Sequence, residues 1–135
     1  KLNWVPDIIH VHGWMASLLP VYMKHYYKDE ALFSDTKIVT SVYGQSFDGN
    51  LDQEMINKVK FDNIPEDAVK ELETPNYDHL IMAAVKHSDG VIIASDNVSA
   101  SLTKFIESSG KPFLPFASKD KFAETYCNFY KNFVL

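Results

Sequence analysis

Hydrophobic positions along the chain alternate between short β-branched runs and longer stretches with helical spacing. The β-branched runs predict buried strands over 8–11, 37–43 and 90–94, with a short fourth strand over 113–114. Between them, apolar residues recur every three or four positions and predict helices over 15–26, 77–85, 98–106 and 122–133, with shorter helices over 51–59 and from Pro65. Strands that alternate with helices form a parallel sheet with right-handed crossovers. The pattern therefore predicts an α/β fold, a three-layer Rossmann-like parallel sheet with helices on both faces.

Capping residues predict where several of these helices begin and end. Asn76 is expected to cap the helix over 77–85. The helix after the third strand has candidate caps at Ser95, Asp96 and Asn97, and it is expected to end at Gly110 and Pro112. Ser118 is expected to open the last helix. The apolar side of that helix, expected to be core or covered by further chain, carries Phe122, Tyr126, Phe129, Tyr130 and Phe133.

Length and composition narrow the class of protein. A chain of 135 residues with 46% hydrophobic and 23% charged residues is typical of one globular domain. The net charge of -5 disfavours nucleic acid and anionic membrane surfaces as partners. Cys127 is the single cysteine, so an internal disulfide or a cysteine-based metal site is excluded, and a reducing cytoplasm is expected. Because Lys1 stands only a few residues before a strand expected to be central, we expect residues 1–135 to be part of a longer protein.

The stretch over 6–14 carries the main candidate chemistry, since it is a buried strand that breaks at Gly13 and leads into a helix. In open α/β sheets, ligands bind where the chain leaves the carboxyl end of a strand. His10 and His12 lie two apart and are expected on one face, where a metal site would need a third ligand. A hydrogen-bonded structural role is favoured for His10, while His12 is better placed to face a cleft. Trp14 is expected to be a core anchor, with a sugar-stacking platform as the alternative.

Several reaction classes lack their sequence signatures. Gly13 fits a tight turn or the close approach of a ligand to the backbone, but neither glycine-rich phosphate motif is present. Ser95 and Ser99 lack the nucleophile elbow, and Asp7 and Asp48 have no evident partner for acid and base chemistry. The sequence therefore predicts no catalytic residue, no metal ligand and no cofactor.

The order of these pieces resembles the N-terminal half of glycogen and starch synthases, glycosyltransferases of the GT-B type. The family hallmark is proline-aspartate, an apolar strand and H-x-H-D-W-H, which stands here as PDIIHVHGWM over 6–15. A helix similar to 16–22 follows, then a strand of the type K-x-V-F-T-I-H-N-L-A-Y-Q-G, matched loosely by 37–49. A helix, strand and helix similar to 83–107 complete a resemblance over about residues 5–110.

The resemblance implies transfer of glucose from ADP-glucose to an α-1,4-glucan. It implies substrate contacts near His12, Gly13 and Trp14, and near Tyr43 and Gly44, which align with a family histidine and asparagine that contact the donor sugar. Gly13 and Met15 stand where the family has aspartate and histidine. Glycine cannot exchange protons and methionine offers only a weak sulfur acceptor, so we expect no turnover by this chain alone.

Two further interpretations stay open. The fold could serve as a non-catalytic module that binds a glucan, an ADP-sugar, a partner subunit or a missing domain. An unrelated flavodoxin-like domain is disfavoured, because the chain lacks the acidic cluster of a receiver domain and a flavin-phosphate loop.

Overall fold

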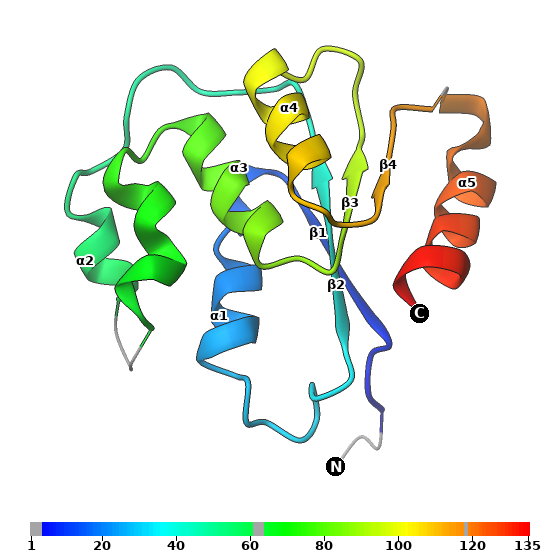
Figure 1. Cartoon of the computed structure of the whole chain (residues 1–135), viewed down its shortest axis with the longest axis horizontal. Coiled ribbons are helices and arrows are strands. Elements are labelled where there is room, and N and C mark those ends of the chain that lie inside the picture. The colour runs from blue at the N-terminus through cyan, green and yellow to red at the C-terminus, as the bar shows by residue number, and fades with distance from the viewer. Residues whose placement is uncertain (1–3, 61–63, 118) are drawn as a thin grey trace.

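The computed structural model describes residues 4–60, 64–117 and 119–135, and its centre is a four-stranded parallel sheet (Figure 1). The strands lie side by side in chain order: β1 (Ile8–His12), β2 (Lys37–Val42), β3 (Gly90–Ile93) and β4 (Phe113–Leu114). Each neighbouring pair is parallel. The predicted α/β class and parallel sheet are confirmed.

Helices and short helical turns fill the connections between the strands. The α-helices are α1 (Leu19–His25), α2 (Met55–Val59), α3 (Tyr77–Lys86), α4 (Ala100–Ser108) and α5 (Phe122–Phe129). The 3-10 segments are η1 (Trp14–Ala16), η2 (Glu66–Glu73), which has a kink at Val69, and η3 (Lys119–Lys121). A π-helical turn, η4 (Tyr130–Val134), extends α5.

Alternating strand side chains divide the core between two faces of the sheet. On one face, Val42, Val91 and Ile93 pack with residues of α3 and α4, while Val11 and Ile38 pack near α1. On the opposite face, the core consists of Val39, Ile92, Phe129 and Val134, the last two supplied by α5 and η4. Figure 1 shows α5 across the sheet from α1, α3 and α4, which gives the expected three layers.

Gly90 allows the C-terminal segment to pack closely on the sheet. A Cβ at this position would lie 3.0 Å from Val134 Cγ2 and 3.3 Å from Phe129 Cε1. A side chain at the start of β3 would therefore push α5 and η4 away from the strands.

The first helix differs from the continuous helix expected over 15–26. The chain leaves Gly13 as the short turn η1, and α1 begins only at Leu19, with Pro20 in its first turn. Proline suits this place because it lacks an N–H and its φ is already helical. Met15 is consequently 83% exposed instead of lying on a buried helix face.

The capping predictions have different outcomes. Asn76 caps α3 as expected, since its side chain accepts a hydrogen bond from His79 N–H at 2.9 Å. The cap of α4 is Ser99, which accepts from Leu102 N–H at 3.2 Å, so the predicted caps at 95–97 are wrong. Ser95 is used elsewhere, because its hydroxyl accepts from Gly44 N–H at 2.6 Å. Ser118 lies outside the described residues.

The first strand also has an unexpected position. Its β-branched sequence predicts a central strand, yet β1 lies at one edge of the four strands, and His12 is exposed. Among the helices of the described residues, none is long and apolar enough to cross a lipid bilayer.

Candidate ligand-binding site

A hollow of about 400 Å³ opens beyond the carboxyl ends of β1 and β2. Its lining consists of Gly13, Trp14, Tyr43, Gln45, Ser46 and Tyr77. Three of the five predicted substrate contacts are thus brought together, although Tyr43 lies about 30 residues along the chain from Gly13 and Trp14.

Aromatic rings form one wall of this hollow. The Trp14 ring lies 4.9 Å from the Phe47 ring, and Phe47 lies 6.0 Å from Tyr77. Trp14 is half-buried against the core of α3 and α4, and it also lines the hollow. Trp14 therefore packs against the core as expected. Because the same side chain also lines the hollow, the alternative role as a platform for a ligand stays open.

Tyr43 is fixed by hydrogen bonds from two elements. Its hydroxyl lies 2.8 Å from His12 Nδ1, and its carbonyl accepts from the Tyr77 hydroxyl at 2.6 Å. Burial raises the pKa of Tyr77, and the nearby Asp78 carboxylate raises it further, so the phenol keeps its proton and donates. These bonds hold the chain after β2 in one position at the mouth of the hollow.

A second hollow of about 500 Å³ shares Tyr43 and Gln45 with the first. Its other lining residues are Gly44, Ala94, Ser95, Asp96, Asn97 and Phe116. Gly44, the fourth predicted contact, lines this hollow, but a Cβ there would lie 2.6 Å from the Asn97 carbonyl oxygen. Its lack of a side chain is thus explained by close packing of the two loops that follow β2 and β3.

Gly13 has a backbone requirement of its own. It adopts φ 75° and ψ 159°, a combination that is essentially restricted to glycine. No heavy atom would lie within 4 Å of an added Cβ, so the constraint comes from the backbone and the space beside Gly13 is open.

His12, the fifth predicted contact, lines neither hollow and lies with His10 on the sheet face covered by α5. The two imidazole rings are 4.0 Å apart, which confirms that they share a face. His10 Nε2 lies 2.8 Å from Ser41 Oγ, and His10 Nδ1 lies 2.6 Å from the Tyr130 hydroxyl. The expected hydrogen-bonded role of His10 is confirmed, and it ties β1 to η4.

The surroundings of His10 favour its neutral form. Burial, together with a smaller effect of the neighbouring His12, lowers its pKa from 6.5 to about 4. Burial also raises the pKa of Tyr130 to about 12. A neutral imidazole donates through one nitrogen and accepts through the other, so both of its hydrogen bonds can form at neutral pH.

We expect the protein to lose stability as the pH falls from 6.5 toward 4. The unfolded chain binds a proton at His10 near pH 6.5 while the folded chain resists it, so the contribution is complete above pH 6.5. A fully realised shift corresponds to about 3 kcal/mol, and solvent reaching the half-buried ring reduces this to about 1–2 kcal/mol. An NMR titration of the His10 ring, with urea unfolding at each pH, measures both quantities. A ring that titrates near pH 6.5 in the folded protein would contradict this assignment.

The described residues offer no group of three His, Cys, Asp or Glu side chains able to hold a metal ion. The side chains that line the first hollow offer aromatic rings, hydroxyls and an amide.

Sequence reasoning missed several lining residues. Some of them follow the carboxyl ends of β2 and β3, namely Gln45, Ser46 and the segment 95–97. The rule that ligands bind at the carboxyl ends of strands therefore could have predicted these positions. Tyr77 and Phe116 reach the hollows from other elements, and no local sequence signal marks them.

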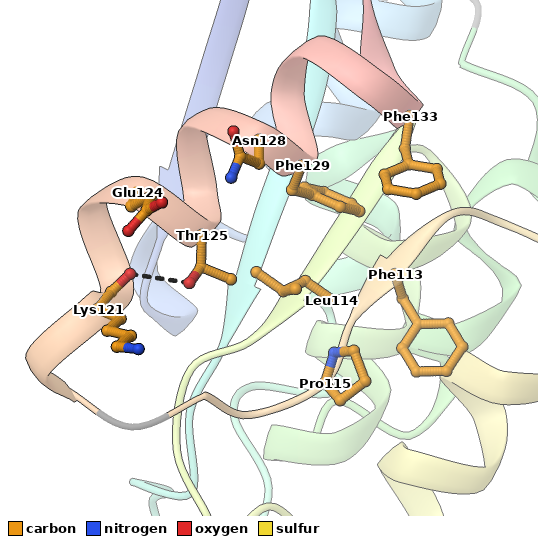
Figure 2. Close-up of a pocket in the computed structure, with 9 residues that line it drawn as sticks. All are labelled: Phe113, Leu114, Pro115, Lys121, Glu124, Thr125, Asn128, Phe129 and Phe133. Carbon is orange, nitrogen blue, oxygen red and sulfur yellow. Dashed lines mark hydrogen bonds between the residues drawn. The ribbon is translucent and has the colours of Figure 1, made fainter.

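A third hollow, of about 490 Å³, lies between β4 and α5 (Figure 2). It contains none of the predicted contacts and is lined by Phe113, Leu114, Pro115, Lys121, Glu124, Thr125, Asn128, Phe129 and Phe133. Figure 2 shows the Phe113, Phe129 and Phe133 rings around one part of it, and the Thr125 hydroxyl donating to the Lys121 carbonyl at 2.8 Å at the other.

Comparison with known proteins identifies relatives over most of the chain. The family model described as "Starch synthase catalytic domain" matches residues 1–110. Glycogen synthase of Chlorobium phaeovibrioides is 29% identical over 104 residues, which cover 76% of this chain and 20% of that protein. Glycogen synthase of Pelodictyon phaeoclathratiforme is 31% identical over 90 residues, covering 66% and 18%, respectively.

The chain thus spans about a fifth of the length of these curated relatives. No solved structure gives a match. Because the family model covers residues 1–110, including both predicted contact segments, the chain belongs to the starch synthase catalytic domain family of glycosyltransferases.

Proposed function

We propose that this chain is a glucan-binding part of a starch synthase-type domain and that it does not transfer glucose by itself. The observation that carries the proposal is the first hollow, where Trp14, Tyr43 and Tyr77 stand beside the polar side chains of Gln45 and Ser46. Such a combination suits a sugar, because aromatic rings cover its apolar face while amides and hydroxyls bond its hydroxyl groups.

The charges of the site favour a neutral glucan over ADP-glucose. A diphosphate is usually held by arginine, lysine or the free N–H groups of a helix N-terminus. Among the described residues that line either hollow there is no lysine, Asp96 lines the second hollow, and the chain contains no arginine. The N-terminus of α4 is already capped by Ser99.

Loss of turnover is supported by the residues at the reactive positions. Gly13 and Met15 replace the aspartate and histidine of the family pattern. The conformation of Gly13 disfavours an aspartate, and the Met15 side chain points to solvent. In the family pattern a second half closes over the donor and excludes water from the reacting bond. We therefore assign ADP-glucose transfer to a larger assembly in which this chain would be one part, in the cytoplasm expected from its single free cysteine.

Tryptophan fluorescence gives a direct test, since Trp4 and Trp14 are the two tryptophans of the chain. In the variant Trp4→Phe, all tryptophan emission comes from Trp14. Adding maltoheptaose is expected to change this emission with saturation, because a stacked sugar displaces water from the indole. In the matched control Trp14→Phe, emission comes from Trp4, which is 70% exposed and away from the hollow, and it is expected to stay unchanged.

Further measurements separate the parts of the proposal. Calorimetry with maltoheptaose and with ADP-glucose is expected to detect the glucan and not the nucleotide sugar. Saturable binding of ADP-glucose alone would contradict the glucan assignment, and binding of neither ligand would contradict a substrate-binding role. Incorporation of labelled glucose from ADP-glucose into glycogen is expected to stay at background. Clear turnover would contradict the proposed inactivity.

A partner-binding role is the second candidate function, and exposed apolar side chains favour it. Trp4, Met15, Phe133 and Leu135 are each more than 60% exposed. Trp4 and Leu135 line one hollow together with Pro6 and Ile8, and contiguous exposed apolar groups are typical of surfaces that become covered in an assembly.

A further inference from the structure

The chain contains two Asp–Gly dipeptides, Asp48–Gly49 and Asp89–Gly90. In such a pair the backbone nitrogen of the glycine can attack the aspartyl side chain, because glycine has no side chain to obstruct the approach. In a folded protein the reaction depends on how firmly the carboxylate and the next peptide unit are held. The two dipeptides of this chain are held very differently.

Asp89 is fixed at the start of β3. Its carboxylate accepts hydrogen bonds from Lys24 Nζ at 2.8 and 2.9 Å and from the Ile38 N–H at 2.8 Å. Its own N–H donates to the Ile38 carbonyl at 2.7 Å. Gly90 is buried, and an added Cβ there would lie 3.0 Å from Val134 Cγ2. Attack by the Gly90 nitrogen would have to break the bonds of the carboxylate in a space that the C-terminal segment already fills.

Asp48 and Gly49 lie in the loop between β2 and α2 (Figure 1), and both residues are exposed. Among the described residues, no hydrogen bond or ion pair holds the Asp48 carboxylate, and the Gly49 N–H donates to no carbonyl. Gly49 has a φ of 76°, and nothing lies within 4 Å of a Cβ built on it. The carboxyl group and the next nitrogen can therefore come together without breaking a contact of the described fold.

We propose that Asp48 is a site of spontaneous isomerisation through a cyclic imide. The Gly49 nitrogen forms a bond to the side-chain carboxyl carbon of Asp48, and the carboxyl hydroxyl leaves with the amide proton as water. Water then adds to one of the two imide carbonyls and breaks its bond to the nitrogen. Opening at the original peptide carbonyl gives isoaspartate, and opening at the other carbonyl restores aspartate. One water is lost and one is gained, so the reaction needs no further reactant.

Isoaspartate at position 48 lengthens the backbone by one methylene directly after Phe47. The Phe47 ring lies 4.9 Å from the Trp14 ring and 6.0 Å from the Tyr77 ring. Because Trp14 and Tyr77 line the first hollow, the modification is expected to disturb its aromatic wall. The isomerisation goes beyond the proposed sugar site and does not depend on it, since the reacting groups belong to the loop itself.

Incubation of the folded whole chain in heavy-oxygen water at mildly acidic pH tests the proposal, because each opening of the imide incorporates one heavy oxygen atom. Trypsin cleaves after lysine and releases residues 38–58 and 87–104, each of which contains a single Asp–Gly dipeptide. Fragmentation in a mass spectrometer locates the label, and chromatography separates isoaspartyl from aspartyl peptides. Asp48 is expected to acquire label and isoaspartate, while Asp89 is expected to react about tenfold more slowly or less.

Two controls connect the difference to the fold. In urea the folded contacts are absent, and both dipeptides are expected to react at similar rates. The variant Asp48→Glu keeps the exposed charge but would have to close a larger ring, so position 48 is expected to stay unlabelled while circular dichroism matches that of the wild type. In Trp4→Phe, the emission of Trp14 is expected to change as isoaspartate accumulates, and to stay constant when Asp48→Glu is added.

The comparison of folded and unfolded samples decides the outcome. A folded chain in which Asp48 stays unlabelled, while the urea sample becomes labelled, would overturn the proposal. Equal labelling of Asp48 and Asp89 in the folded chain would overturn it as well, because the reactivity would then not follow from the contacts of the two dipeptides. Constant Trp14 emission during full conversion would contradict the expected effect on the hollow.

Discussion

Replacing Phe129 by alanine is expected to lower the free energy of unfolding by about 3–5 kcal/mol. Phe129 is 3% exposed, and with Val39, Ile92 and Val134 it forms the core on the α5 face of the sheet. Alanine would leave a cavity against Gly90, where the ring now packs. The position lies beyond residues 1–110, the part that matches the family. A large effect would therefore show that the C-terminal segment is an integral layer of this fold.

Phe122 provides the matched control on the same helix. Its side chain is 55% exposed, so Phe122→Ala is expected to change the free energy of unfolding by less than about 0.5 kcal/mol. Urea unfolding monitored by circular dichroism measures both variants under the same conditions. Equal effects of the two substitutions would contradict the assignment of Phe129 to the core.

Replacing Gly44 by alanine is expected to destabilise the protein by about 2–3 kcal/mol through overpacking. The added Cβ would lie 2.6 Å from the Asn97 carbonyl oxygen and would also overlap the Asn97 side chain. The loops after β2 and β3 must then move apart, which strains the bond from Gly44 N–H to Ser95 Oγ. Because both loops line the second hollow, its shape changes with the stability.

Ser46→Ala is the control for the Gly44 variant. Ser46 is exposed on the same loop, so its free energy of unfolding is expected to stay within about 0.5 kcal/mol of the wild type. The double variant Gly44→Ala, Asn97→Gly is expected to recover part of the loss, since it removes the side-chain overlap and keeps the carbonyl contact. No recovery at all would indicate that the strain arises elsewhere.

The class of fold and most of the elements follow from local patterns in the sequence. The β-branched runs that form β2 and β3 predict buried strands. Asn76 marks the start of α3 because its side chain accepts a hydrogen bond from an N–H in the first turn of that helix. Such signals are local, so they can be recognised without knowledge of the rest of the chain. The motif over 6–15 likewise indicated the family, because it combines strand, turn and tryptophan in a fixed order.

Other features depend on contacts between residues far apart in the chain, so they are visible only in the folded protein. The sequence predicts Ser95 as a helix cap. In the folded protein its hydroxyl instead accepts a hydrogen bond from Gly44 N–H, 51 positions away, and Ser99 caps α4. Tyr77 lines the first hollow and its hydroxyl donates to the Tyr43 carbonyl. No local sequence pattern encodes this contact. His12 turned toward Tyr43 and away from the hollows, and β1 came to lie at an edge. These outcomes follow from competition among distant partners for the same hydrogen bonds and the same space, which is settled only when the sheet has assembled.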